Sequence, residues 1–156
     1  MSDDARVRLA DPDDHVAVMR VLEGALLEVE ASTVREGIDR EAVWVAVVES
    51  SDGGSPDDRV VGALVLDTPA REGVAPRPEE VRPDSRHVEA VAVTRQRRGR
   101  GVGRMLVETA LEETGCDRLT AEFRPDVEPF YAALGFDVET VPGDEERRWG
   151  ELRTGR

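Results

Sequence analysis

The segment RHVEAVAVTRQRRGRGVGRMLVETALEETG, residues 86–115, decides the fold of this chain. Its first part, His87–Thr94, is rich in valine and alanine, which predicts a half-buried or fully buried strand. Its last part, Val102–Thr114, has apolar residues at the spacing of one helix face, and Gly115 is a suitable C-terminal stop. Between them lies Arg95–Gly103, a loop dense in arginine and glycine. A strand, a glycine loop and a helix N-terminus in this order predict an anion site.

The composition of the loop supports this prediction. The first turn of a helix has N–H groups without intrahelical partners, and the helix dipole adds about half a positive charge there. Gly99, Gly101 and Gly103 lack a Cβ atom, so their backbone is open to close approach by a phosphate. The whole chain has a net charge of −13, yet residues 90–107 contain five arginines and no acid. This local reversal of sign indicates an anionic ligand.

Two common phosphate motifs are absent from the loop. The dinucleotide pattern G-x-G-x-x-G fails in both registers because its last position is Arg104 or Leu106, and the P-loop fails because the chain contains no lysine. The loop resembles instead the acetyl-CoA motif Q/R-x-x-G-x-G/A of the GNAT superfamily of N-acetyltransferases. Here the motif is Arg98-Gly99-Arg100-Gly101-Val102-Gly103, and Val93 closes the strand five residues earlier. The alternative is a solvated arginine and glycine loop before a helix.

The resemblance covers nearly the whole chain and is most specific over residues 87–136. It implies an α/β (α+β) fold in which helices flank a mixed, mostly antiparallel central sheet, and it implies that residues 1–156 form a single domain. The sequence predicts strands at residues 5–9, 41–50, 59–68, 87–94, 117–123, 136–141 and 147–152. It predicts helices at residues 13–31, 102–114 and 127–134, with a short helix or a loop at 32–37. The strands at 87–94 and 117–123 flank a helix, so we expect them to be parallel.

Several local features are also expected. Asp11 offers an N-cap for the first helix, and Asp126 offers one for the last helix, where Pro129 is tolerated in the first turn. Gly62 indicates a bulge or a close approach. Residues 51–58 have turn chemistry, and residues 69–85 form a loop without periodicity. The first helix should pack through the stripe Val16, Met19, Leu22, Leu26 and Val29.

A second match is Phe130-Tyr131-Ala132-Ala133-Leu134-Gly135-Phe136, which resembles the family's FYxxLGF segment. The resemblance implies that Tyr131 is the general acid that protonates the leaving sulfur of coenzyme A. The alternative is an aromatic side chain that only packs on the core. The sequence departs from the family pattern at Arg124, where Asn is frequent, and at Val127, where Ala is frequent.

The resemblance also implies where acetyl-CoA, the co-substrate, is held. The pantetheine arm would pair with backbone groups of the central strand, which a bulge or a divergence between the two parallel strands leaves open. The amide near Val93 would face the thioester oxygen, and the diphosphate would lie on the amides of the glycine loop. The expected cofactor-binding residues are Val91, Ala92, Val93, Arg98, Gly99, Arg100, Gly101, Val102, Gly103 and Arg104.

The residue that deprotonates the acceptor amine is less clearly marked. Glu89 is the first candidate, because alternation along the strand places it on the face of Val91 and Val93. Its alternatives are a solvent-facing position or a pair with Arg86. Glu122 in the partner strand, or a water molecule, are the other candidates for the base.

Composition limits the remaining possibilities. The chain has 34 acidic residues against 21 arginines, so it should repel nucleic acid and acidic membranes. It has neither a long apolar run nor a secretory signal pattern, which predicts a cytoplasmic protein. The composition is similar to that of proteins from extreme halophiles, in which case structure should be lost at low salt, or it reflects an arginine-biased, GC-rich genome.

Few other residues carry chemistry. His15 and His87 are isolated and no cluster has metal-ligand spacing, so no metal is expected. Cys116 is the single cysteine and is expected to be a small core residue rather than a nucleophile. Trp44 fits a core strand, whereas Trp149 either packs or lines the acceptor site.

The function implied by the resemblance is direct transfer of an acetyl group from acetyl-CoA to an amine in a ternary complex. A catalytically inactive acyl-CoA-binding sensor or interaction module is the alternative, and a generic phosphate-binding domain is a third. The acceptor is not defined by the sequence, although the acidic surface favours a cationic one: a polyamine, a basic peptide or a protein N-terminus. Dimerisation is common in the family, so a homodimer is compatible with the resemblance.

Overall fold

The structure of the protein is a computed structural model that describes residues 5–25, 29–49, 58–66 and 85–153. Its single sheet has seven strands in the order β1-β2-β3-β4-β5-β7-β6, and all neighbouring strands are antiparallel except the pair β4 and β5. The strands are β1 (Arg6–Leu9), β2 (Val43–Glu49), β3 (Asp58–Leu66), β4 (Ser85–Val93), β5 (Arg118–Phe123), β6 (Asp137–Val141) and β7 (Asp144–Arg153). The helices are α1 (His15–Gly24), α2 (Ala31–Asp39), α3 (Val102–Thr114) and α4 (Glu128–Ala133), with short 3-10 helices at Pro12–Asp14, Arg95–Arg97 and Pro125–Val127. The predicted fold class and the predicted parallel pair are therefore confirmed.

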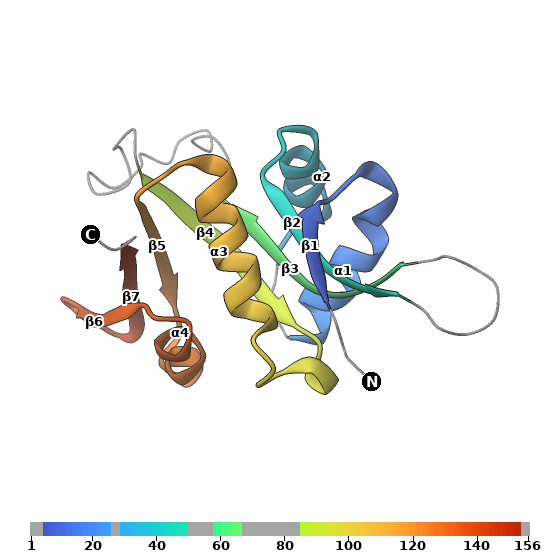
Figure 1. Cartoon of the computed structure of the whole chain (residues 1–156). Helices are drawn as coiled ribbons and strands as arrows, with labels where there is room; N and C mark the ends of the chain where they lie inside the picture. The colour runs from blue at the N-terminus through green and yellow to red at the C-terminus, as the bar shows by residue number, and fades with distance from the viewer. Residues whose placement is uncertain (1–4, 26–28, 50–57, 67–84, 154–156) are drawn as a thin grey trace.

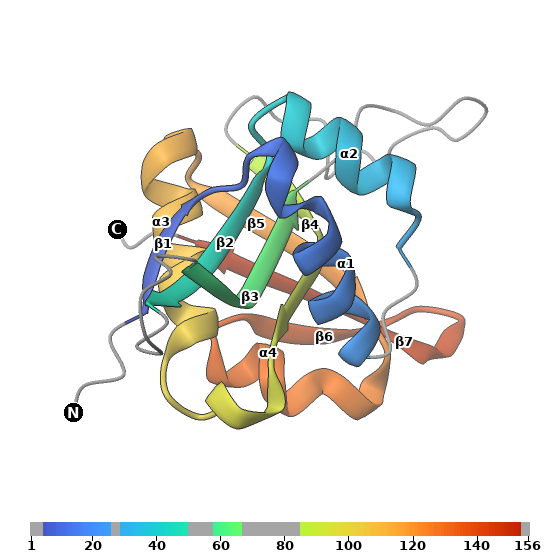
Figure 2. The same ribbon diagram turned by 90° about the vertical axis from the view of Figure 1, so that its right-hand side faces the viewer.

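Helices cover the two faces of the sheet unequally (Figures 1 and 2). On one face, α3 contributes Val102, Leu106 and Ala110 to a core shared with β2–β5 and α4. On the other face, α1 and α2 pack on β2, β3 and β4 and bury a second core around Leu22 and Val34. The central strands thus lie between two apolar layers. None of the described helices combines the length and the hydrophobicity needed to cross a membrane.

The first helix differs from the prediction. α1 ends at Gly24, so Val29 lies outside it, and Val16 is 66% exposed instead of buried. The buried face is formed by Val18, Val21 and Leu22, which follow a second i, i+3, i+4 pattern in the same segment. Leu26 lies outside the described residues, as do positions 51–57 of the turn predicted at 51–58 and positions 69–84 of the loop predicted at 69–85.

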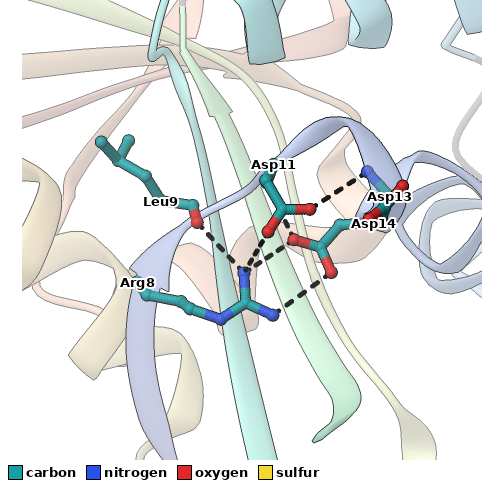
Figure 3. A network of polar contacts seen from close by, with 5 residues as sticks. All are labelled: Arg8, Leu9, Asp11, Asp13 and Asp14. Carbon is teal, nitrogen blue, oxygen red and sulfur yellow. Dashed lines mark hydrogen bonds and ion pairs between the residues drawn. The ribbon is translucent and has the colours of Figure 1, made fainter. Parts of the chain in front are cut away.

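Two of the predicted caps have different outcomes. Asp11 does cap the first turn, because its carboxylate accepts from the Asp13 amide at 3.0 Å and its amide donates to Asp14 Oδ2 at 2.8 Å (Figure 3). Asp126 is not the cap of α4: a 3-10 turn intervenes and Val127 occupies the cap position without a side-chain bond. Pro129 does lie in the first turn of α4, as expected.

An ion pair fastens β1 to the start of α1 (Figure 3). Arg8 donates through Nη1 to Asp14 Oδ2 at 2.7 Å and through Nη2 to Asp14 Oδ1 at 3.2 Å. Burial acts to raise the pKa of Asp14, but the bonds from Arg8 and from the Asp11 amide outweigh it, so this pKa lies below its usual value. The pair therefore stabilises the fold when Asp14 is ionised.

Gly62 of β3 shows both features that were expected of it. A Cβ atom here would lie 3.1 Å from the side chains of Leu106 and Val102, so glycine lets α3 approach the sheet. The register against β2 shifts beside it, leaving Val61 as the extra residue of a bulge.

Candidate active site

The strands β4 and β5 begin together and then separate (Figure 1). Their parallel pairing runs from Ser85↔Arg118 to Val88↔Ala121 and ends there. β4 continues to Val93 and β5 to Phe123, so the last five residues of β4 and the last two of β5 extend beyond the parallel ladder that joins the two strands. The divergence predicted from the sequence is therefore present, and it opens the sheet at its centre.

The backbone of β4 points into this opening at alternate residues. The Thr94 amide donates to the Val61 carbonyl of β3 at 2.8 Å, and polar groups alternate in direction along a strand. The polar groups of Ala92, which lies opposite Ala63, therefore face β3, whereas those of Val91 and Val93 face the opening. Of the three predicted strand residues, Val91 and Val93 therefore direct their backbone polar groups into the opening, and Ala92 directs its groups toward β3.

Arg98 has a structural contact that was not predicted. Its Nε donates to the Val93 carbonyl at 2.9 Å, and this bond ties the loop back to the end of β4. Because a carbonyl oxygen is neutral, the bond leaves the positive charge of Arg98 in place beside the opening. The amide of Val93 is not involved in this contact.

The three glycines of the motif have different roles. Gly99 and Gly101 have φ of 77° and 83°, a left-handed conformation that favours glycine, and a Cβ atom at either would meet no atom within 4 Å. Gly103 is buried, and a Cβ atom here would lie 3.1 Å from Leu134 Cδ2. The missing side chain of Gly103 therefore lets α3 pack on α4, whereas the space around Gly99 and Gly101 is open.

The N-terminus of α3 faces the same loop. The first backbone bond of the helix runs from the Met105 amide to the Gly101 carbonyl at 3.0 Å, so the amides of Val102, Gly103 and Arg104 precede the hydrogen-bonded ladder. Arg104 Nη2 donates to the Ala133 carbonyl at 3.0 Å and so links α3 to the end of α4. These amides and the nearby arginines give the loop the chemistry of an anion site.

Tyr131 lies on the α3 side of the sheet. Its ring stacks on Phe123, the last residue of β5, with centroids 4.0 Å apart, and it meets Phe130 and Phe136 edge-on at 5.4 Å each. The residue is 8% exposed, and burial raises the pKa of its hydroxyl, so the group stays protonated at neutral pH. Within the described ranges no residue hydrogen-bonds this hydroxyl. The ring therefore packs in the core while its proton remains available to a ligand.

The other face of β5 and β7 is polar. Glu122 accepts from Arg147 Nε at 2.9 Å, so the second candidate base already forms an ion pair. Glu89 is the extra residue of a bulge, since Val88 lies opposite Leu66 and Ala90 opposite Val65. The side chain of Glu89 was predicted to lie on the face of Val91 and Val93 because side chains alternate along a strand. The bulge interrupts this alternation, and Val88 instead of Glu89 shares a core cluster with Val91 and Val93.

His87 was predicted to be isolated, because nothing near it in the sequence is a partner, but in the fold it is not. In the fold its Nδ1 lies 2.8 Å from Thr120 Oγ1, and its ring stacks on Trp149 at 5.8 Å. The parallel register brings His87 and Thr120 opposite each other. Trp149 thus belongs to the polar face, a position that the sequence left open.

The remaining candidates have structural roles. Cys116 is buried, with its Sγ 3.2 Å from Thr114 Oγ1, and Trp44 is a core residue whose Nε1 donates to Glu113 at 2.8 Å. In the described part of the chain no three His, Cys, Asp or Glu side chains are grouped so that they could hold a metal ion.

Comparison with known proteins identifies the family. A family model described as an acetyltransferase (GNAT) domain matches residues 39–138, which is more than half of the chain. The chain therefore belongs to the GNAT acetyltransferase family. The search of curated proteins gave no match.

Solved structures of this family have the same fold. Ard1 from Thermoplasma volcanium has 19% identity and a TM-score of 0.69, with 97% of this chain and 99% of that chain covered. The ribosomal-protein-S18-alanine N-acetyltransferase from Escherichia coli has 15% identity and a TM-score of 0.66, with 98% and 96% covered. A chain of the NatC complex bound to Gag peptide and CoA has 17% identity and a TM-score of 0.69, with 97% and 99% covered.

Proposed function

We propose that this protein is an acetyl-CoA-dependent N-acetyltransferase that transfers the acetyl group directly to an amine in a ternary complex. The observation that carries the proposal is the opening between β4 and β5, which begins after Val88↔Ala121 and ends at the N-terminus of α3. Membership of the GNAT family and the CoA bound in the NatC structure support it.

In this proposal the opening receives the arm of acetyl-CoA. The backbone groups of Val91 and Val93 pair with the pantetheine amides, and the Val93 amide donates to the thioester oxygen. The diphosphate lies on the amides of Gly99 to Gly103, where the left-handed conformations of Gly99 and Gly101 turn the chain into the helix. Arg100 and Arg104 contribute positive charge, and Arg98 holds the loop in place through Val93.

Tyr131 is the general acid of the proposed reaction. The departing thiolate of coenzyme A is a strong base in an apolar site, and a phenol that burial keeps protonated is a suitable donor. Its ring is fixed by Phe123, Phe130 and Phe136, so the hydroxyl is held in one direction. Glu89 and Glu122 are the carboxylates that the sequence predicts as candidate bases for deprotonating the acceptor amine.

The test is an assay for free coenzyme A. We expect the protein to release thiol from acetyl-CoA only when an amine is present, with the amines drawn from polyamines, lysine-containing peptides, peptide N-termini and amino acids. Mass spectrometry of the acceptor should show one added acetyl group per thiol released. If acetyl-CoA raised the melting temperature but no amine released thiol, the protein would be an acyl-CoA-binding module instead.

We also propose that the protein works in a cytoplasm of high salt. The chain of 156 residues has a net charge of −13, so its acidic side chains repel one another at low ionic strength, and salt screens this repulsion. The melting temperature should therefore rise between dilute buffer and molar KCl. If the melting temperature did not change with salt, we would explain the acidic, arginine-rich composition by an arginine-biased, GC-rich genome instead.

A further inference from the structure

The helix that carries Tyr131 is short and has no side-chain cap. α4 has six residues, and Val127 occupies its cap position without a side-chain bond. Isolated helices of this length are not stable in water, so the place of α4 depends on contacts with the rest of the fold. The direction of the Tyr131 hydroxyl therefore depends on the residues that hold α4 against the sheet.

Strand β7 provides one of these contacts through Arg148. Its Nε donates to Glu128 Oε1, in the first turn of α4, at 3.1 Å. Its Nη1 donates to the carbonyls of Glu145 and Arg147 at 3.1 Å each, so the guanidinium is also held by its own strand. The ion pair thus joins a fixed point of β7 to the start of α4.

The register places Arg148 beside the ring that supports the tyrosine. Arg148 lies opposite Phe123 in the antiparallel pair of β5 and β7, and opposite residues of such a pair point to the same face of the sheet. Tyr131 stacks on the Phe123 ring, with centroids 4.0 Å apart and planes 3° apart. The cation that holds α4 and the ring that supports Tyr131 therefore come from one cross-strand pair.

Gly150 of β7 leaves room for the same ring. A Cβ atom at Gly150 would lie 3.0 Å from Phe123 Cε2 and 3.2 Å from Phe136 Cδ2. Both rings contact Tyr131, and rigid rings in a packed core have little space to move aside. β7 thus sets the position of Tyr131 at two points, through the Phe123 ring and through Glu128.

Resting on the proposed function, in which Tyr131 is the general acid, we infer that Arg148 is a positioning residue for that acid. It acts through Glu128, because the ion pair holds α4 where the phenol can reach the sulfur of the bound thioester. A general acid must lie within hydrogen-bond reach of the leaving atom, and a displacement of about 1 Å costs much of its effect. The paired side chains are 22% and 43% exposed, and ion pairs of this kind contribute little to stability, so the effect on turnover should exceed the effect on folding.

Arg148 lies away from the loop that is proposed to bind the diphosphate. In the sheet β5 stands between β7 and β4, and the loop follows β4. Arg104 holds the other end of α4 through the Ala133 carbonyl, but it begins in α3 beside that loop, so its loss would also change coenzyme binding. Arg148 is therefore the arginine whose loss separates positioning from binding.

The kinetic test removes the ion pair from either side. In Arg148→Met we expect kcat to fall about fivefold, less than in a variant without the hydroxyl, while the Kd for acetyl-CoA stays the same. Glu128→Ala should reproduce this fall, because it leaves the contacts of Arg148 within β7 in place. Glu128→Gln keeps an oxygen that accepts from Nε and should restore most of the turnover. If Arg148→Met did not fold, the two variants of Glu128 would give the same comparison.

The matched control is Arg153→Met, on the same strand. Arg153 is 68% exposed and pairs with Glu151 at 2.8 Å. This variant therefore removes an arginine and an ion pair from β7 without touching the contact with α4. It should leave kcat unchanged.

A double-mutant cycle with Tyr131→Phe shows whether Arg148 acts through the tyrosine. Without the hydroxyl there is no proton to position, so Arg148→Met should change kcat by less than about twofold in the Tyr131→Phe background. A merely structural role of Arg148 would give the same fall in both backgrounds.

Tyr131 is the single tyrosine of the chain, which gives a measurement that does not depend on activity. In protein made with isotopically labelled tyrosine, the NMR signals of this ring should be shifted by the stacked ring of Phe123. These signals should move in Arg148→Met and in Glu128→Ala, while the rest of the spectrum stays that of the folded protein. In Arg153→Met they should stay in place.

The outcomes separate the two proposals. Tyrosine signals that do not move in the folded Arg148→Met and Glu128→Ala variants would overturn the role of Arg148, whether or not the protein is active. Thiol release that is unchanged in Arg148→Met, or reduced equally in both backgrounds, would overturn that role and leave the acetyltransferase proposal standing. Absence of thiol release by the unaltered protein with every amine would overturn the proposed function and with it the catalytic role of the pair, even if the signals moved.

Discussion

Strands β2 and β5, which lie on either side of the central strands β3 and β4, differ in what covers them. In β2 and the residue before it, every side chain from Ala42 to Val48 is buried, because α3 covers one face and α2 the other. In β5 the apolar Leu119, Ala121 and Phe123 face the core under α3, while the alternating positions are polar: Arg118, Thr120 and Glu122. The half of the sheet around β2, which helices cover on both faces, is the two-sided half and forms the structural core. The half around β5, which α3 covers on one face, is the one-sided half and carries polar side chains on its other face.

The candidate active site lies at the border between these halves. β4 pairs with β3 along most of its length, but β5 leaves it after Val88. A sheet with unpaired backbone groups at its centre pays a large cost unless a ligand or a side chain satisfies them. Arg98 satisfies the Val93 carbonyl, and the remaining groups are those to which we assign acetyl-CoA.

The largest expected effect is a loss of stability that compares a core position in the two-sided half of the sheet with one in the one-sided half. Leu64 of β3 is 0% exposed, so Leu64→Ala should reduce the free energy of unfolding by about 2–5 kcal/mol through lost burial and a cavity. Leu152 of β7 is only partly buried, so Leu152→Ala should cost about 1–2 kcal/mol. Chemical denaturation of both variants at molar KCl gives the two values. Equal losses would show that the two halves are packed alike, contrary to the comparison.

The next effect concerns the core side of the opening. Tyr131→Phe keeps the ring that stacks on Phe123 but removes the hydroxyl. We expect turnover to fall tenfold or more, which is about 1.4 kcal/mol or more in the activation barrier, with the Kd for acetyl-CoA and the melting temperature nearly unchanged. Steady-state kinetics and calorimetric titration with acetyl-CoA measure these quantities. Full turnover in the variant would reduce Tyr131 to a packing residue.

The smallest effect concerns the attachment of α1, which covers the two-sided half. Asp14→Asn weakens the pair with Arg8 and should lower the free energy of unfolding by about 1 kcal/mol at neutral pH. The folded-state pKa of Asp14 is depressed, so its contribution is present above the usual carboxyl pKa and is lost as pH falls through the folded value.

The difference in stability between the two proteins should therefore vanish in acid. Unfolding curves measured from neutral pH downward show whether it does. Asp13→Asn is the control, because Asp13 is exposed and only its amide takes part in the cap. A constant difference at every pH would mean that the charge of Asp14 is not what fastens β1 to α1.

The features that sequence reasoning predicted well depend on neighbouring residues. α3 has the predicted bounds and Gly115 ends it with a φ of 71°, because helix periodicity and a left-handed glycine are local properties. The features that the sequence did not reveal concern partners that are distant in the chain. A glycine at position 103 leaves room for Leu134 of the α4 region, and the burial of Val18 in place of Val16 is set by the face that α1 turns toward the sheet.

The catalytic hypothesis shows the same division. Tyr131 was found from a seven-residue segment, although the sequence could not separate its hydroxyl from its packing. Alternation along β4 was the basis for choosing Glu89, and the bulge that breaks this alternation arises only when β4 pairs with β3. The contacts of His87 with Thr120 and Trp149 had no local signal either, since they depend on the order of the strands.

The sequence by itself determined the elements, their order, the family and the loop that resembles a coenzyme A site, because glycine conformations, helix periodicity and charge are properties of short segments. Only the tertiary structure decided where β4 and β5 separate, which part of the sheet the described helices cover and which side chains meet at the separation. Those contacts join residues tens of positions apart, and their geometry is set by the register of the sheet and by the packing of the helices on it.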